Sequence, residues 1–201
     1  MHPNPAFRSE DRALLETIIE QVGFGMIFAQ LPDGPRVAHT PIVSTGDGAV
    51  HFHLARANGL TRHLDGMTAL IVVNGPDAYV SPRWYAEEGS VPTWNYVALE
   101  LEGRVRMMGE EGLAGLLEAL GRRQEARITS GGQPWTPDAV PQDQWNKLIR
   151  GIVGFEMEVL AWRPTFKLSQ NKDAVTREQV AEGLEANGAA ALAQLMRSLA
   201  P

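Results

Sequence analysis

Apolar and polar positions alternate along most of the chain with the short periods that are typical of strands and helices. Residues 9–22 predict an amphipathic helix, because apolar side chains recur every three to four positions and Ser9 stands where a capping residue is expected. Three strand-like runs follow, and the two turns between them each contain an Asp-Gly step. These runs cover residues 24–30, 36–43 and 49–54.

The rest of the pattern predicts further strands and helices in alternation. Strands are expected in a buried run that resumes after Gly75-Pro76, in a long alternating run bent at Gly103, and in a run near the C-terminus: residues 68–81, 93–108 and 154–162. Residues 164–171 fit either a loop or an edge strand. Helices are expected over residues 57–64, 110–124, 142–150 and 176–199, the last of them broken at Asn187-Gly188. Six or seven short strands with helices packed outside predict a small antiparallel β-barrel.

Length and composition narrow the class of protein. A chain of 201 residues suffices for one domain with a substantial core, or for one domain with a small appendage. No apolar run approaches the ~18 residues of a membrane span, and the first residues lack the basic and apolar regions of a signal peptide. The absence of cysteine excludes disulfides and is compatible with a reducing cytoplasm, which is the location we expect.

Charge and motifs disfavour several function classes. The net charge of −6 argues against broad nucleic-acid binding, and the segment 189–199, which superficially resembles a recognition helix, carries a single cation. We therefore expect no direct DNA binding. No phosphate-binding loop or nucleophile motif occurs, and no catalytic residue is assigned. His51 and His53 alternate on one strand face, but two histidines alone make a weak metal site, so no metal is expected.

The densest aromatic segment, residues 81–96, contains Trp84, Tyr85, Trp94 and Tyr96 around two prolines and a short acidic turn. Tryptophan and tyrosine combine a large flat face with a polar tip, so the segment is suited to hold a planar ligand or a partner subunit. A hairpin capped by aromatic side chains is an equally good interpretation of these residue types.

Five ordered segments carry a resemblance to a known family. They read HLARAN at 53–58, GPDAYVSPRWY at 75–85, VPTWNY at 91–96, IVGFE at 152–156 and KLSQN at 167–171. Together they resemble the PaiB family, described as FMN-binding negative transcriptional regulators, over nearly the whole chain. The resemblance implies a mainly β fold with flanking helices, the split antiparallel β-barrel of the FMN-binding type. It further implies a single domain over residues 1–201 with peripheral and C-terminal helices, and a homodimer with FMN at the subunit interface.

One group of cofactor contacts is expected in the first half of the chain. Arg56, Ala57 and Asn58 follow a strand and open the predicted short helix, whose free N–H groups and Arg56 are suited to the FMN phosphate. A surface arginine in a turn is the alternative. By resemblance, residues His39, Thr40 and Pro41 face the flavin ring, and an ordinary polar strand face is the alternative. His53 is expected either to line the site or to lie in the core.

A second group is expected further along the chain. Asn74 is expected to hydrogen-bond the flavin edge, and Trp94 and Asn95 to reach the ring from the partner subunit, although packing and turn formation explain these residues equally well. In the polar run that contains Lys167 and Gln170, the lysine is suited to stabilise negative charge on a reduced flavin. A lysine that extends its stem over the surface is the alternative.

The sequence departs from the family pattern where Gly59, Leu60 and Thr61 replace a common Pro-x-Trp, and where Glu100 replaces a histidine. Two hypotheses follow. The chain is an FMN-binding homodimer with a redox or sensing role, which leaves a flavin-dependent oxidoreductase open. Alternatively, it is a flavin-free interaction or regulatory module that retains the split-barrel fold.

Overall fold

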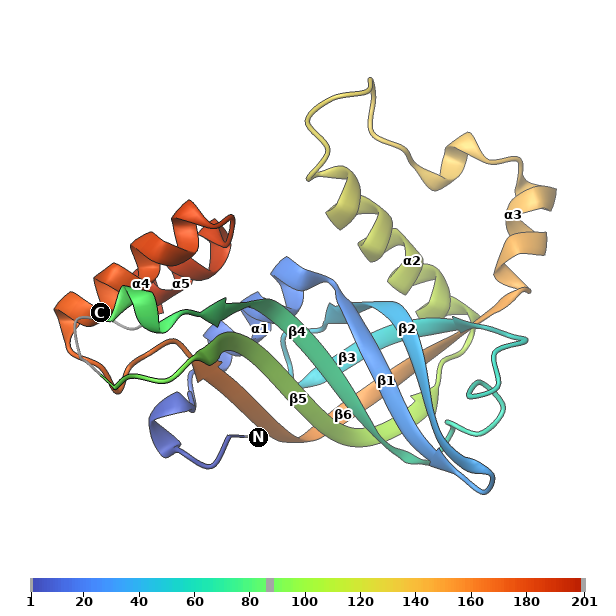
Figure 1. Cartoon of the computed structure of the whole chain (residues 1–201). Helices are drawn as coiled ribbons and strands as arrows, with labels where there is room; N and C mark the ends of the chain where they lie inside the picture. The colour runs from blue at the N-terminus through green and yellow to red at the C-terminus, as the bar shows by residue number, and fades with distance from the viewer. Residues whose placement is uncertain (1, 86–88, 200–201) are drawn as a thin grey trace. The chain divides into compact units, whose positions relative to one another are not determined.

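The computed structural model describes residues 2–85 and 89–199. Six strands form a closed barrel in the order β1-β2-β3-β6-β5-β4 (Figure 1). They are β1 Phe24–Leu31, β2 Gly34–Ser44, β3 Ala49–Ala55, β4 Thr68–Val80, β5 Thr93–Met107 and β6 Ile152–Lys167. The pairs β1–β2, β1–β4, β2–β3 and β3–β6 are antiparallel, so the expected antiparallel β-barrel with flanking helices is confirmed.

The barrel core follows from strict alternation along the strands. In β1 every second side chain is buried, and the same holds in β3, where Val50, Phe52 and Leu54 point inward. Phe52 pairs with Phe155 of β6, and their stacked rings lie 5.4 Å apart between centroids. Burying a phenylalanine contributes about 1.5–3 kcal/mol, so this pair is a substantial part of the core.

Gly103 of β5 permits a close approach between strands. A Cβ atom at this position would lie 2.0 Å from the carbonyl oxygen of Glu158 in β6. Only glycine fits there, because two strand backbones meet where a side chain would otherwise stand.

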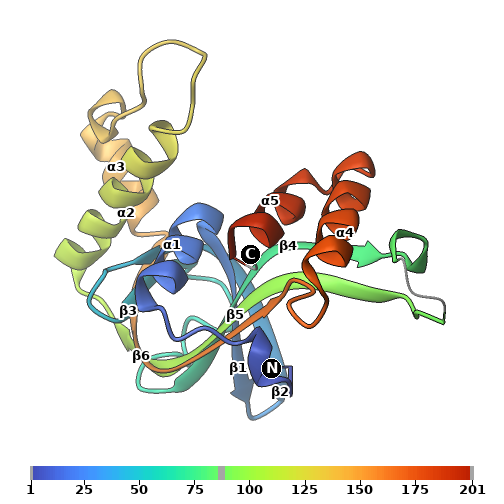
Figure 2. The same cartoon turned by 90° about the vertical axis from the view of Figure 1, so that its left-hand side faces the viewer.

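Five α-helices occur in the described part of the chain: α1 Arg12–Val22, α2 Glu110–Glu125, α3 Gln142–Ile149, α4 Ala174–Ala186 and α5 Ala190–Leu199. Short 3-10 turns occur at η1 Pro5–Phe7, η2 Pro82–Trp84 and η3 Pro137–Ala139. Helix α2 buries Leu116 and Leu120 against Val43 of β2. Helices α4 and α5 lie side by side, with the predicted break between them (Figure 2).

Three details of the sequence-based prediction are wrong. Asp11, not Ser9, supplies the cap of α1, since its Oδ1 accepts a hydrogen bond from the Leu14 N–H at 3.2 Å. Residues 57–64 form successive turns instead of a helix. Strand β4 runs without a break through Pro76. Strand β6 likewise continues through Pro164, so of the two interpretations of residues 164–171 the strand holds as far as Lys167.

The residues group into two compact units. The first comprises Met1–Leu15, Asn74–Glu100 and Arg163–Pro201, and the second comprises Glu16–Val73 and Leu101–Trp162. The expectation of a single domain stays a prediction. The acidic turn of the aromatic segment, at residues 86–88, lies outside the described residues.

No helix within residues 2–85 and 89–199 combines the length and apolarity that crossing a lipid bilayer requires.

Candidate functional site

Strand β2 presents the residues expected at the flavin ring on alternate sides. His39 is exposed, whereas Thr40 is 2% exposed and its Oγ1 donates a hydrogen bond to the His53 carbonyl oxygen at 2.5 Å. Pro41 is again partly exposed. A ligand on the outside of the barrel would therefore meet His39 and Pro41, while Thr40 fixes the β2–β3 pair from inside.

An apolar groove of about 460 Å³, which we call the α2–α3 groove, brings Pro41 and His53 together with residues that sequence reasoning missed. Its volume lies within the ~300–1,000 Å³ of pockets for small molecules and cofactors. The barrel contributes Pro41, His53 and Ile152; α2 contributes Leu117, Leu120, Gly121, Gln124 and Glu125; Trp145, Leu148 and Ile149 come from α3, and Trp135 from the loop between the helices.

His53 is one of three polar residues that line the α2–α3 groove, together with Gln124 and Glu125. Its Nδ1 atom is buried and has no hydrogen-bond partner within the described residues. Burial lowers the pKa of His53 from its ordinary value, which keeps the ring neutral at pH 7. A buried polar atom without a partner is costly in free energy, so His53 is suited to meet a ligand atom at this point.

Two tryptophans supply flat walls for the groove. The Trp135 and Trp145 rings lie 6.2 Å apart between centroids and are tilted by 43°. Trp135 is held over α2, because its backbone N–H donates to Glu125 Oε2 at 3.0 Å and Gly121 leaves room for the ring. The only sequence signal for these residues was a tryptophan inside a polar Gly/Pro-rich loop.

Arg56 lies next to one end of the groove. Its Nε donates to the Arg150 carbonyl at 2.8 Å, and its Nη2 donates to the carbonyl of the groove residue Ile152 at 3.2 Å. Two of its five N–H groups are thereby used, and the other three bond no residue in the part of the chain that the structure describes. Because residues 57–64 are not helical, the expected helix N-terminus is absent and Asn58 instead accepts from the Leu60 N–H at 2.9 Å.

The departures from the family pattern at residues 59–61 have structural roles. Leu60 is 1% exposed, and the Thr61 hydroxyl donates to the Ala55 carbonyl at 2.8 Å. A Cβ atom at Gly59 would meet nothing within 4 Å. These residues therefore stabilise the turn itself, and Ala57 lies within it.

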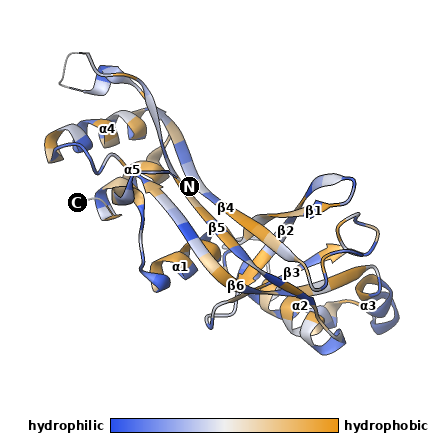
Figure 3. Cartoon of the chain, turned by 90° about the horizontal axis from the view of Figure 1, so that it is seen from below, coloured by the Kyte–Doolittle hydropathy of each residue, from blue (hydrophilic) through white to orange (hydrophobic). Residues whose placement is uncertain are grey.

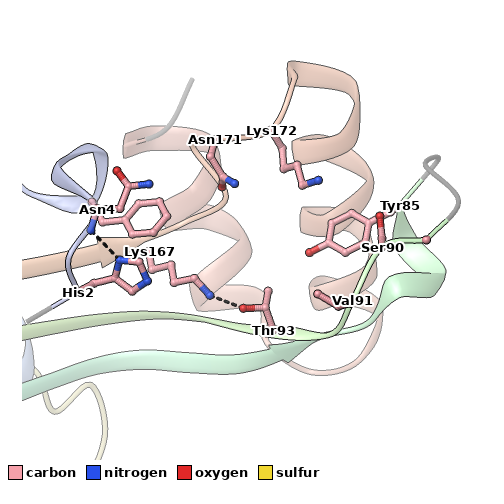
Figure 4. A pocket seen from close by; sticks show the side chains of 11 residues that line it. His2, Asn4, Tyr85, Ser90, Val91, Thr93, Lys167, Asn171 and Lys172 are labelled. Atoms are coloured by element: carbon pink, nitrogen blue, oxygen red, sulfur yellow. Dashed lines mark hydrogen bonds between the residues drawn. The ribbon is translucent and has the colours of Figure 1, made fainter.

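The remaining predicted residues belong to the other compact unit. Lys167 Nζ donates to Thr93 Oγ1 (Figure 4). It also donates to the Trp94 carbonyl at 2.5 Å. Gln170 turns back on its own loop, since its Nε2 donates to the Phe166 carbonyl at 2.5 Å and its Oε1 accepts from the Leu168 N–H at 2.8 Å.

Asn95 and Trp94 differ in exposure. Asn95 is 1% exposed and its Nδ2 donates to Ser169 Oγ at 2.9 Å, so it ties β5 to the loop after β6. Trp94 is 53% exposed and packs edge-on against Tyr79 at 6.4 Å between ring centroids. Asn74 is exposed on β4. Of these three, Trp94 and Asn74 remain accessible to a ligand or a second subunit.

The histidine pair of β3 does not form a metal centre in the described residues. His51 Nε2 lies 2.9 Å from Glu156 Oε2, so this histidine has a carboxylate partner. No cluster of three or more histidine, aspartate or glutamate side chains suited to a metal occurs within residues 2–85 and 89–199.

A contiguous apolar surface covers the outside of three neighbouring strands, and we call it the β4–β1–β2 face. Phe24, Phe28 and Val37 are 49%, 36% and 44% exposed. Strand register places Phe28 between Leu70 and Val37, and Met26 between Val72 and His39. Figure 3 shows the hydrophobic colour along β1 and β4. Phe24 pairs with the groove residue Pro41, so the face borders the α2–α3 groove.

Comparison with protein families identifies the family of this chain. Residues 1–161 match the family described as "Putative FMN-binding domain". The chain belongs to this FMN-binding family. Family membership assigns FMN as the cofactor, as expected from the sequence.

Similar proteins support the same family and fold. The chain is 28% identical over 171 residues to "Protease synthase and sporulation protein PAI 2" of Bacillus subtilis, covering 83% of this chain and 81% of that protein, which confirms the resemblance to the PaiB family. An uncharacterized protein of Emericella nidulans is also 28% identical, over 89% of this chain and 83% of its own.

Solved structures confirm the split-barrel fold. The FAD and heme binding protein of Mycobacterium smegmatis superposes with a TM-score of 0.62 at 17% identity, over 87% of this chain and 79% of that one. The flavocytochrome Anf3 of Azotobacter vinelandii gives a TM-score of 0.59 at 15% identity, over 83% and 72% of the two chains.

Proposed function

We propose that the protein binds FMN in the α2–α3 groove, as a homodimer, and uses the bound flavin in a redox or sensing role. The observation that carries this proposal is the buried Nδ1 of His53, which has no partner in the described part of the chain and lies in a groove lined mainly by apolar and aromatic side chains, with Gln124 and Glu125 as the other polar ones. A flavin ring is planar and largely apolar with polar edges, so it matches Pro41, the two tryptophans and one hydrogen-bonding histidine.

The charge distribution along the groove supports one orientation of the ligand. Arg56 lies beside the Ile152 end, where its three unused N–H groups meet no acidic partner among the described residues. Guanidinium groups bind phosphate through paired N–H donors. The FMN phosphate therefore belongs at the Arg56 end, and the ring lies toward His53.

The β4–β1–β2 face supports the homodimer. Monomeric proteins rarely leave large contiguous apolar patches exposed, and such patches mark interfaces. Because this face borders the groove at the Phe24–Pro41 pair, a second copy packed on it would lie beside the flavin. His39, which is exposed on the same face, would then contribute to the site from the interface.

The bound flavin would supply the electron-transfer chemistry, and this chain's residues would bind it, orient it and exclude water.

Direct binding of DNA through helix α5 is not supported. Arg197, the single cation of that helix, donates to Glu178 at 2.8 Å and Glu185 at 3.0 Å. These carboxylates hold the pKa of Arg197 above its ordinary value and occupy the donors that a DNA phosphate would need.

The deciding experiment is the visible absorption spectrum of the purified protein after addition of FMN and desalting, for the wild type and two histidine variants. The wild type is expected to retain about one flavin per chain. His53→Ala is expected to weaken FMN binding about three- to tenfold, as for one lost neutral hydrogen bond of about 0.5–1.5 kcal/mol.

His51→Ala is the matched control, because His51 lies on the same side of β3 but pairs with Glu156 and does not line the groove. It is expected to bind FMN as the wild type does. A wild type that stays colourless and takes up no FMN would instead support the flavin-free interaction module.

A further inference from the structure

A second cavity, of about 720 Å³, shares part of its wall with the α2–α3 groove. Helix α2, residues 134–138 and Trp145 of α3 surround it. Figure 1 shows the segment between the two helices as an arch that leads from the end of α2 to the start of α3. Both cavities are lined by Gly121, Glu125, Trp135 and Trp145, so a molecule in one would lie beside a molecule in the other. We call the second one the Trp135 cavity.

Two indole rings give the Trp135 cavity its aromatic walls. The ring planes of Trp135 and Trp145 are tilted by 43°, with 6.2 Å between the centroids, so the two rings form an angled pair instead of a flat stack. Trp135 rests on α2, since a Cβ atom at Gly121 would lie 3.3 Å from its Cζ3 atom. The face of a tryptophan ring attracts a cation that comes within about 6 Å of the centroid. Two neighbouring indoles therefore favour a positively charged nitrogen.

The charges around the cavity favour the same kind of ligand. Three carboxylates and one guanidinium line it, those of Glu118, Glu125, Asp138 and Arg122. Arg122 Nη1 lies 3.9 Å from Glu118 Oε1, so these two charges offset each other. Glu125 accepts the neutral backbone N–H of Trp135, and no cation in the described part of the chain pairs with Glu125 or Asp138. Two carboxylates beside an indole pair thus lack a countercharge that a cationic ligand would supply.

The size and lining of the cavity favour an organic cation over a metal ion. No group of three or more histidine, aspartate or glutamate side chains that could hold a metal occurs in the described ranges 2–85 and 89–199. The volume of the cavity is that of sites for small molecules, and Pro134 and Pro137 add apolar surface to the two indoles. Methyl groups on a charged nitrogen would contact these surfaces and leave the charge near the carboxylates.

We propose that the Trp135 cavity binds a small organic cation, an ammonium whose nitrogen carries methyl or other apolar groups, as a second ligand beside FMN. The rings of Trp135 and Trp145 contact the groups on the nitrogen, and Glu125 and Asp138 supply the countercharge. That the two ligands are neighbours rests on the proposed function, which puts FMN in the α2–α3 groove, whereas binding of the cation does not depend on FMN.

The test compares choline with its neutral carbon analogue 3,3-dimethyl-1-butanol, in which a carbon atom replaces the charged nitrogen, and with ethanolamine, which lacks the methyl groups. Binding is measured by ligand-observed NMR titration, with and without saturating FMN. Choline is expected to bind in both cases. The neutral analogue is expected to bind at least about tenfold more weakly because it has no charge for the indoles and carboxylates, and ethanolamine at least about threefold more weakly because it lacks the methyl contacts.

Asp138→Asn retains the shape of the side chain, removes its charge and leaves the α2–α3 groove unaltered, because Asp138 lines the Trp135 cavity alone. It is expected to weaken choline binding about threefold and to leave FMN binding unchanged. Glu125→Gln, which can still accept the Trp135 N–H, is expected to weaken choline binding at least about threefold. Asp143→Asn is the matched control, since it changes the net charge equally on α3 and lines neither cavity.

Four outcomes would overturn the proposal: no choline binding by the wild type up to about 10 mM, equal binding of the neutral analogue or of ethanolamine, equal weakening by Asp143→Asn and Asp138→Asn, or displacement of choline by FMN, which would make the cavity part of the flavin site. Choline binding is measured without any flavin signal. A failure of FMN uptake therefore leaves this result intact, and the reverse also holds.

Discussion

Gly183 shows how a single missing side chain positions a helix. A Cβ atom at this position of α4 would lie 2.4 Å from Cδ2 of Trp84 and 2.6 Å from its Cε2, so the helix backbone rests directly on the indole ring. Trp84 belongs to η2, which the Ser81 hydroxyl caps by accepting from the Arg83 N–H at 3.3 Å. Trp84, one of the two tryptophans of the aromatic segment, thus has a packing role within its compact unit.

Gly183→Ala is expected to destabilise the protein, although alanine is the better helix former. Removing a glycine from a helix gains about 1 kcal/mol, whereas forcing a methyl group into a filled space costs about 1–3 kcal/mol. A contact at 2.4 Å to a rigid ring leaves little room for relaxation, so the cost should exceed the gain. The measurement is the free energy of unfolding from urea denaturation.

Gly115→Ala is the matched control, since Gly115 lies in α2 and an added Cβ atom would meet nothing within 4 Å. It is expected to stabilise by up to about 1 kcal/mol. An equal stabilisation by both substitutions would contradict the close packing of α4 on Trp84.

The sequence, together with its resemblance to the PaiB family, predicted part of the candidate site. Pro41 and His53 were named from the sequence, and the structure places both in the α2–α3 groove. Thr40 and Gln170 were chosen for their hydrogen-bonding groups, but their side chains bond nearby backbone atoms. A sequence shows which groups are polar, whereas only the fold shows which of them the backbone already uses.

Among the elements, the barrel strands were predicted well and the connections less well. Alternating patterns located β1, β2 and β3 to within two residues at each end. The turns over residues 57–64 imitate a helix because Leu60 and Leu64 are both buried at helical spacing. Strand β4 continues past Gly75-Pro76 because Gly75 lies against β5, where a Cβ atom would be 2.9 Å from that of Val97.

Helix α4 owes its N-terminus to Asp173, and this makes its stability sensitive to acid. Asp173 accepts hydrogen bonds from the Thr176 N–H at 2.9 Å and from its hydroxyl at 2.7 Å, and these bonds lower the pKa of the carboxyl. A carboxyl with a lowered folded-state pKa stabilises the fold above its unfolded pKa of about 3.9, and this contribution is lost as the pH falls through the folded value.

The stability difference between the wild type and Asp173→Ala is therefore expected to be largest near neutral pH and to shrink as the pH is lowered from about 5 to about 2. Urea midpoints across this range provide the measurement. Asp77→Ala, which removes an exposed carboxylate of β4, is the control for general charge effects. A difference for Asp173→Ala that did not change with pH would assign the capping energy to something other than the ionised carboxylate.

At the scale of the whole molecule, the fold brings the exposed apolar side chains of Phe24, Phe28 and Val37 together on the β4–β1–β2 face. The alternation that predicted β1 also requires one side of it to face outward, but it could not show that the neighbouring strands contribute apolar residues to the same side. That follows only from the register, which places Leu70, Phe28 and Val37 in one row. The face therefore becomes visible as an interface only in three dimensions.

Val37→Glu tests the homodimer on the β2 side of this face. Val37 is 44% exposed, so a single folded chain tolerates the charge, whereas a packed interface would bury it without a partner. The wild type is expected to sediment as a dimer and Val37→Glu as a monomer. Since the face borders the α2–α3 groove, the monomer should also lose bound FMN.

The control for this experiment is Leu160→Glu, which puts the same charge at a 65% exposed aliphatic position of β6 outside the face. It is expected to remain a dimer and to retain FMN. If Leu160→Glu dissociates and Val37→Glu does not, the interface lies on β6. If the wild type is monomeric and still holds FMN, the α2–α3 groove suffices for the cofactor, and the apolar face has another partner.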